Sequence, residues 1–259
     1  QHHPRSAVLA GGGFIGVELM ENLRELGIDV TVVQRPRQLL NPLDADMAAF
    51  LHAKLRQKGV RLHLGCTVEG FAANGDRVNV LLKDEAPLTA DMVVLAIGVT
   101  PDTGLAKAAG LELGIKGSIL VNDRMETSAP DIYAVGDAVQ VKHFVTGQDT
   151  LLSLAGPANK QGRIAADNIC GGDSRYQGSQ GSSVLKLFDL TAAVTGINER
   201  TARQAGIDCD KVYLSPISHA GYYPGGKVMT LKVVFEKGTY RLLGAQIVGY
   251  EGVDKRIDV

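Results

Sequence analysis

Residues 6–19 read Ser6-Ala7-Val8-Leu9-Ala10-Gly11-Gly12-Gly13-Phe14-Ile15-Gly16-Val17-Glu18-Leu19. An apolar run passes into the spacing GxGxxG and then into apolar residues at helical intervals, which predicts a strand, a tight turn and a helix. Gly11 permits the turn, Gly13 lets the backbone approach a pyrophosphate, and Gly16 lets the helix pack against the strand. The helix N-terminus adds the positive end of its dipole. The stretch therefore predicts a dinucleotide site, with Phe14 and Ile15 as further contacts.

The residue that reads the ribose is expected about 20 residues after the glycine loop, at the end of a second strand over residues 29–34. The common NAD pattern has Asp or Glu there, whereas this chain has Gln34-Arg35-Pro36-Arg37. A neutral amide beside two guanidinium groups suits a 2′-phosphate, because Arg binds phosphate in a bidentate fork. We therefore expect NADPH, or use of both NADPH and NADH. The alternative is that Arg35 and Arg37 are solvated turn residues.

A second informative stretch is Thr127-Ser128-Ala129-Pro130-Asp131-Ile132-Tyr133-Ala134-Val135-Gly136-Asp137. It predicts an apolar strand that ends at Gly136 and puts the carboxylate of Asp137 at the mouth of a sheet. The alternative is a buried strand followed by an ordinary Gly-Asp turn. A helix is expected to begin near Pro157, since proline is favoured in a first helical turn. Its start, including Ala155, would face whatever Asp137 holds.

The order of the expected elements indicates an α/β fold with a doubly wound sheet from Ser6 to about Met125. The expected elements are a strand over 6–10, a helix over 14–26, strands over 29–34 and 61–64, a helix over 45–58, hairpin-like strands within 68–82 and a strand over 93–97. Gly98 follows that last strand, where ligands collect in such sheets, so it is either a cofactor contact or a turn glycine.

A cluster of Gly and Ser between residues 171 and 183 marks a boundary. Beyond it, β-like runs cover residues 184–188, 192–195, 211–214, 229–235 and 242–248. The last residues, 253–259, are typical of the start of a helix, so we expect sequence to be missing at the C-terminus. Gln1 does not look like a native start, and His2 and His3 beside it are left out of any metal site.

Composition excludes several classes of protein. With 45% hydrophobic and 21% charged residues, the 259-residue chain can bury a core and most simply forms two or more domains. A net charge of −1 and the lack of a basic run argue against nucleic acid or an acidic membrane as partner. No apolar run is long enough to cross a bilayer and no signal peptide is present, so we expect a soluble, cytoplasmic protein.

The three cysteines, Cys66, Cys170 and Cys209, stand far apart and form no metal-ligand spacing. Their odd number fits a reducing compartment. Cys66 is expected at the end of a strand as an ordinary thiol without a redox role, and no metal site is expected.

Together, the glycine loop, the Tyr133-Ala134-Val135-Gly136-Asp137 string and the late β region resemble the pyridine nucleotide-disulfide oxidoreductases. The strings Gly221-Tyr222-Tyr223-Pro224-Gly225 and 251–258 resemble the branch of coenzyme A-disulfide reductases, NADH oxidases and persulfide or polysulfide reductases. The resemblance covers residues 6–259. It implies an NAD(P)H domain over 6–126, the second part of an FAD domain over 127–176, and the beginning of a homodimerising interface domain over 180–259. It also implies that the first FAD half, with the active cysteine, lies outside this chain.

The resemblance implies that hydride passes from NAD(P)H to FAD and that two electrons then reach a cysteine sulfur. The partner would be a small-molecule disulfide or persulfide, with coenzyme A as a substrate. Asp137 matches the residue that holds the ribityl chain of FAD. Glu18 matches an acid that faces the nicotinamide, unless it only complements the helix dipole.

Tyr222 and Tyr223 match a tyrosine pair near the sulfur of the partner subunit, where a phenol can protonate a departing thiolate. The alternative is a pair of core or interface aromatics. Lys255 and Arg256 would meet coenzyme A phosphates, or else be surface charges or dimer contacts. Two rival functions stay open: an NADH oxidase or peroxidase of the same fold, and a nucleotide-binding fragment with no catalysis of its own.

Overall fold

The computed structural model describes residues 3–258, and Gln1, His2 and Val259, on which expectations about the termini rest, lie outside that range. The chain forms two compact units. Unit 1 contains the residues up to Gly98, Val184–Val194 and the residues from Asn198 onward. Unit 2 contains Val99–Ser183 and Thr195–Ile197.

Unit 1 is built on a four-stranded parallel sheet with the order β3-β2-β1-β7. Its elements are β1 (Ser6–Ala10), α1 (Phe14–Glu25), β2 (Asp29–Gln34), α2 (Ala45–Gln57), β3 (Arg61–Leu64) and β7 (Met92–Leu95). The parallel βαβαβ arrangement confirms the expected doubly wound α/β class. The first three strands begin and end where the sequence pattern places them.

The two faces of β1 bury alternate residues, because successive side chains in a strand point to opposite sides. Ala7 and Leu9 pack in one cluster with residues of α1, and Val8 packs in another with Val80. The second cluster lies under a small antiparallel sheet of β4 (Val68–Asn74), β5 (Arg77–Leu82) and β6 (Leu88–Ala90). The hairpin was expected, whereas β6 is an additional strand.

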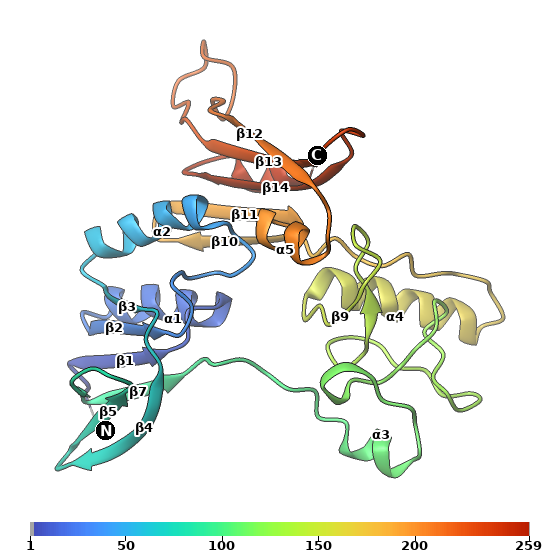
Figure 1. Ribbon diagram of the computed structural model, residues 1–259, viewed down its shortest axis with the longest axis horizontal. Helices are drawn as coiled ribbons and strands as arrows, with labels where there is room; N and C mark the ends of the chain where they lie inside the picture. Colours follow the sequence, from blue (N-terminus) through green and yellow to red (C-terminus); the bar gives the residue numbers. More distant parts are fainter. Residues whose placement is uncertain (1–2, 259) are drawn as a thin grey trace. The chain divides into compact units, whose positions relative to one another are not determined.

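The C-terminal part of unit 1 is a five-stranded sheet with the order β10-β11-β14-β13-β12. Its elements are β10 (Ser183–Leu187), β11 (Leu190–Gly196), α5 (Glu199–Gln204), β12 (Cys209–Leu214), β13 (Thr230–Glu236), β14 (Leu242–Gly249) and α6 (Val253–Ile257). Figure 1 shows α1 and α2 between this sheet and the parallel sheet. The opposite face of the five-stranded sheet packs on α6 through Ile247, Met229 and Val253.

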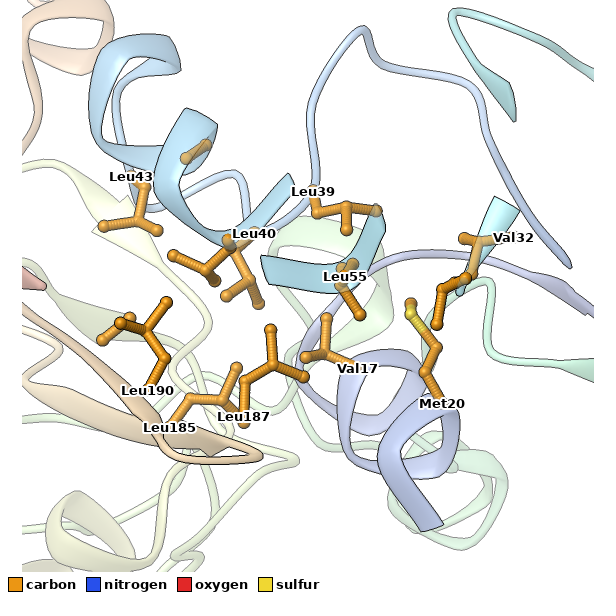
Figure 2. Close-up of a cluster of buried hydrophobic side chains, with 14 of the residues drawn as sticks. Val17, Met20, Val32, Leu39, Leu40, Leu43, Leu55, Leu185, Leu187 and Leu190 are labelled. Carbon is orange, nitrogen blue, oxygen red and sulfur yellow. The ribbon is translucent and has the colours of Figure 1, made fainter. Parts of the chain in front are cut away.

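One hydrophobic cluster joins the two sheets of unit 1. Figure 2 shows Leu185, Leu187 and Leu190 of the β10–β11 hairpin beside Leu40 and Val17, in the same buried cluster. Each fully buried leucine contributes about 1.5–3 kcal/mol of transfer free energy. The parallel sheet with its helices and the five-stranded sheet therefore share one hydrophobic core.

Unit 2 contains α3 (Gly104–Ala108), the 3₁₀ turn η1 (Ile115–Gly117), β8 (Val141–Lys142), β9 (Asp149–Thr150) and α4 (Ala155–Ile169). Its core brings together Met125, Val139, Val141, Ala165 and Tyr176. Helix α4 begins at Ala155, two residues before the expected start at Pro157.

The strand expected to end at Gly136-Asp137 is not formed in unit 2. Only a single antiparallel bridge joins Glu126 to Tyr133 in this stretch. A strand needs a ladder of hydrogen bonds along a neighbour, and here the neighbouring backbone supplies one bridge. The prediction of a strand was wrong, although the Gly-Asp turn after it is present.

Candidate functional site

A cleft of about 660 Å³ lies at the carboxyl ends of the parallel strands of unit 1. The residues that line it come from the glycine loop, the end of β2, the segment before α2, the turn after β3 and the segment after β7. Helix α1 leaves β1 toward β2 on one side, while β7 pairs with β1 on the other side. The cleft therefore sits where ligands bind in open α/β sheets.

Three glycines shape the glycine loop: Gly11 and Gly13 line the cleft, whereas Gly16 lies behind the loop and does not line it. Gly11 has φ +112°, and a Cβ there would stand 2.2 Å from the carbonyl oxygen of Ala96. A Cβ on Gly16 would stand 2.2 Å from the carbonyl oxygen of Gly11, so only glycine lets α1 approach the loop. A Cβ added at Gly13 would meet no atom within 4 Å. Gly13 is the N-cap of α1, and no side chain caps the first N–H groups of the helix. Free N–H groups at such a helix start suit an anion.

Gln34 has a role that sequence reasoning missed. Its side-chain oxygen accepts a hydrogen bond of 2.9 Å from the backbone N–H of Gly12. The amide oxygen therefore braces the glycine loop, and the amide nitrogen is the group left for a ligand, with only a 3.5 Å contact to the carbonyl of Gln38. A glutamine at a strand end gives no sequence signal for this bond.

The other predicted residues of unit 1 divide between the cleft and its surroundings. Phe14, Arg35 and Gly98 line the cleft, and Gly98 has φ +115°. Ile15 is 60% exposed and does not line it. Glu18 is exposed in the second turn of α1, because the first turn starts at Phe14 and contains no acid. It thus lies within the first turns of the helix, and it does not line the cleft.

The cleft also has a wall that the sequence did not indicate, formed by Leu40, Asn41 and Pro42. Leu40 has φ +49°, which is uncommon for a residue with a branched side chain. Cys66 lines the cleft from the turn after β3, as a buried residue. Burial, helped by the nearby Glu85, raises the pKa of the Cys66 thiol, so it stays protonated rather than becoming a reactive thiolate.

Unit 2 holds the other predicted cofactor residues. Gly136 has φ +85°, and its N–H donates a 2.7 Å hydrogen bond to the side-chain oxygen of Gln161 in α4. Gln161 is buried, so this bond fixes the turn against the helix. Asp137 follows with an exposed side chain, and Ala155 is exposed at the start of α4. The turn and the helix thus belong to one local arrangement, with Gln161 as a link that the sequence did not indicate.

Tyr222 and Tyr223 lie in the long loop between β12 and β13, which extends past the end of the sheet (Figure 1). They are 84% and 62% exposed, and their ring centroids are 5.1 Å apart. Neither lines the cleft. Arg256 donates a 2.6 Å hydrogen bond to the carbonyl of Ser218 in the same loop, while Lys255 is exposed.

Within residues 3–258, no group of three or more His, Cys, Asp or Glu side chains is placed to hold a metal ion. None of the helices in that range combines the length and apolar character that a membrane span requires.

Comparison with solved structures identifies close likenesses. A structure of reduced CoADR-RHD from Bacillus anthracis is 48% identical, with a TM-score of 0.94 over 98% of this chain and 46% of that chain. An NAD-dependent persulfide reductase from A. fulgidus is 39% identical, with a TM-score of 0.94 over 98% of this chain and 48% of that chain.

Among curated proteins, an NAD(P)H sulfur oxidoreductase (CoA-dependent) from Pyrococcus abyssi is 36% identical over 97% of this chain. The chain spans 56% of the length of that relative. Residues 1–162 match the family described as pyridine nucleotide-disulphide oxidoreductase, and residues 182–259 match the dimerisation domain of that family. The chain belongs to the pyridine nucleotide-disulphide oxidoreductase family.

Proposed function

We propose that this chain supplies the NAD(P)H site, and part of the FAD site, of an FAD-dependent NAD(P)H:disulfide oxidoreductase. The observation that carries the proposal is the cleft of unit 1, where Gly13 leaves the start of α1 open beside Arg35 and Gln34. In this role the cofactors supply hydride and electron transfer. The residues of this chain bind and orient them.

We propose the following contacts with the cofactors. Gly13 and the first N–H groups of α1 would hold the pyrophosphate, and Gly98 would border the nicotinamide half. In unit 2, the exposed carboxylate of Asp137 would bind the ribityl chain of FAD, with the start of α4 at Ala155 beside it. We propose the same domain limits as the sequence indicates: 6–126 for NAD(P)H, 127–176 for FAD and 180–259 for the interface. The break between the two matched family regions supports the last boundary.

The electron acceptor we propose is coenzyme A disulfide or a related persulfide or polysulfide, reduced by a cysteine outside this chain in a homodimer. Support comes from relatives named for coenzyme A disulfide and for persulfide. Tyr222 or Tyr223 would then donate a proton to the departing thiolate, and their exposure leaves both phenols accessible to a partner subunit.

A second candidate, an NADH oxidase, is favoured by a relative of that name from Methanocaldococcus jannaschii, 36% identical over 98% of this chain. Oxidation of NADPH by the whole protein that contains the proposed cysteine, purified after incubation with FAD and assayed with and without oxygen, separates the two. Turnover with coenzyme A disulfide in the absence of oxygen supports the disulfide reductase. Turnover with oxygen alone supports the oxidase. A folded protein that holds no flavin and oxidises no nucleotide supports the third reading, a binding fragment without catalysis.

For the nucleotide we propose NADPH as the preferred ligand. A water-forming oxidase engineered as an NADPH oxidase carries an Asp to Ala change followed directly by an Ala to Arg change. The glycine and the aspartate altered in that oxidase stand as far apart in its sequence as Gly16 and Gln34 do here. This equal spacing supports the proposal that Arg35 corresponds to the introduced arginine.

Gln34→Glu tests this preference. The variant keeps an oxygen acceptor for the Gly12 N–H but adds a negative charge that repels a 2′-phosphate. We expect the Kd for NADPH to rise about tenfold or more, while the Kd for NADH falls or stays constant. Arg35→Ala is the matched control, since it should weaken NADPH binding alone. Equal Kd values for both nucleotides in the wild-type protein and both variants would remove the proposed preference.

A further inference from the structure

The wall of the nucleotide cleft at Leu40, Asn41 and Pro42 is held from outside the parallel sheet. Its backbone carbonyl groups point to the start of α5, a helix that follows the β10–β11 hairpin and belongs to the region matched as a dimerisation domain. All these residues lie in unit 1. The wall therefore both lines the cleft and contacts the start of the region matched as a dimerisation domain.

Asn198 makes the central contact. Its side-chain nitrogen donates hydrogen bonds of 3.0 Å to the carbonyl of Asn41 and 3.1 Å to the carbonyl of Pro42. Its side-chain oxygen accepts a 2.9 Å bond from the N–H of Thr201 and so caps α5. Asn198 is only 3% exposed, and these bonds are therefore shielded from water. Arg200 adds a 2.7 Å bond to the carbonyl of Asn41 from the exposed side.

The segment that leads from the wall into α2 is held by the five-stranded sheet. The backbone N–H of Asp44 donates a 2.7 Å bond to Gln246, whose amide nitrogen donates a 2.7 Å bond back to the Asp44 carboxylate. Lys232, 1% exposed in β13, contacts the same carboxylate at 2.9 Å. The segment therefore cannot shift without breaking buried polar contacts.

The other end of the wall is tied to the glycine loop. The N–H of Leu40 donates a 2.9 Å bond to the carbonyl of Gly12, and the side chain of Leu39 fills the space where Gly12 would carry a Cβ. Leu40 holds its left-handed backbone at φ +49° between these two attachments. Such a conformation persists where surrounding contacts determine it.

We propose that Asn198 is a positioning residue for the NAD(P)H cleft, through which the start of the dimerisation region sets the affinity for the nucleotide. The inference rests on the proposed function, since it assumes that the cleft binds NAD(P)H. Asn198 acts through the carbonyls of Asn41 and Pro42, and these act through Leu40 on the loop at Gly12. Because the glycine loop would contact the part that NADPH and NADH share, a change at Asn198 alters the affinity for both by the same factor.

Asn198→Ser is the first test. Serine keeps an oxygen acceptor for the Thr201 N–H, so the cap of α5 is retained, but it removes the donor to the wall. We expect the Kd for NADPH and the Kd for NADH to rise together, by roughly three- to thirtyfold. Asn198→Asp, which turns the donor into an acceptor facing two carbonyls, should weaken binding further. Both Kd values are measured by calorimetric titration of the full chain.

Ile247→Ala is the matched control. Ile247 is buried in the cluster on the opposite face of the five-stranded sheet, so its truncation destabilises the sheet without touching the wall. We expect the control to lower the free energy of unfolding while both Kd values stay constant. Arg35→Ala should raise the Kd for NADPH alone, which separates loss of a direct ligand contact from loss of positioning.

The outcomes separate the inference from the function on which it rests. A folded wild-type chain that binds neither nucleotide removes the proposed function. Wild-type binding with unchanged Kd values in Asn198→Ser shows Asn198 to be a helix cap only and overturns the inference. The same holds if Ile247→Ala weakens binding as much as Asn198→Ser. If both Asn198 variants fail to fold, Arg200→Ala is the decisive variant, because Arg200 is exposed and bonds the same carbonyl of Asn41. We then expect both Kd values to rise by a smaller common factor. Unchanged Kd values in Arg200→Ala would overturn the proposal.

Discussion

Gly16 is the residue at which the fold of the glycine loop is most sensitive to one added carbon. The Cβ of Gly16→Ala would stand 2.2 Å from a backbone oxygen of Gly11, which cannot move aside as a flexible side chain would. We expect the free energy of unfolding to fall by about 1–3 kcal/mol. The measurement is urea denaturation of the purified chain.

Gly13→Ala is the control for that change, because its Cβ meets nothing within 4 Å and its φ of −78° suits alanine. It should cost at most about 1 kcal/mol, since alanine is a poorer N-cap than glycine. A loss of stability in Gly13→Ala as large as in Gly16→Ala would show that steric contact at Gly16 is not the cause.

His52 is expected to make the free energy of unfolding depend on pH. Its Nε2 accepts a 3.1 Å hydrogen bond from the N–H of Leu39. The pKa of His52 is lowered mainly because the ring is buried, and further because the positive charge of Arg56 lies nearby. The unfolded chain therefore takes up a proton near pH 6.5 while the folded chain resists it. The contribution of His52 to stability is complete above about pH 6.5 and is lost as the pH falls through the lower folded pKa.

We expect the free energy of unfolding to fall between about pH 7.5 and about pH 5.5, and to fall less in His52→Gln, which carries a neutral acceptor. Burial also lowers the pKa of His143, but that residue is present in both proteins and its effect cancels in the comparison. An equal fall in the wild type and the variant would exclude His52 as a source of the pH dependence.

The sequence predicted the positions in the glycine loop at which the backbone requires glycine. Gly11 and Gly16 are required by sterics, and a GxGxxG motif between a strand and a helix states that need directly. Gln34, Leu40 and Asn198 act through hydrogen bonds to main-chain groups distant in sequence. Any polar side chain or backbone can make such bonds, so no residue pattern announces them.

Lys232 connects three elements of unit 1, because the carboxylates of Asp44, Asp46 and Glu199 all lie within 2.9 Å of its Nζ. Burial disfavours its charge, but hydrogen bonds to these carboxylates outweigh burial and raise the pKa of Lys232. The three acids come from the start of α2 and from α5, while Lys232 is in β13. The single cation therefore holds two helices against the sheet.

Lys232→Met should destabilise the chain by about 3–5 kcal/mol near neutral pH, because three carboxylates then lie together without their buried cation. The loss should shrink toward about pH 4, because the variant lacks the Lys232 cation that helps to hold the pKa of Asp46 and of Glu199 below the usual carboxyl range. Lys211→Met is the matched control: Lys211 is partly exposed and pairs with Glu199, so its loss should cost only about 0–1 kcal/mol. Urea denaturation at both pH values measures the effect, and equal losses for the two lysines would contradict this account.

At the level of elements, regular hydrophobic patterns predicted most strands and helices well. Strand β2 was expected over 29–34 and is formed there, since alternate apolar residues pack on both faces. The stretch before Asp137 is equally apolar and forms only one bridge. Its side chains fit a strand, but strand formation depends on a neighbouring ladder, which a local pattern does not report.

For the whole molecule, the shared core of unit 1 predicts cooperative unfolding of the parallel sheet and the five-stranded sheet together. Leu187 of β10 is 1% exposed in the cluster that also contains Leu9 and Val17. Leu187→Ala should cost about 2–5 kcal/mol and lower the melting temperature of unit 1 as one transition. NADPH at about 100 times its Kd should stabilise that same transition by about 2.7 kcal/mol. Differential scanning calorimetry would contradict the account if NADPH raised one transition and Leu187→Ala lowered another.

The central claim, that the cleft of unit 1 binds NAD(P)H, is tested most directly by calorimetric titration of NADPH into the folded chain. We expect one site per chain, with affinity weakened about tenfold or more in Gly13→Ala, because the added carbon would stand where the pyrophosphate is proposed to approach. A folded wild-type chain that binds neither NADPH nor NADH, or a Gly13→Ala variant that binds as tightly as the wild type, would contradict it.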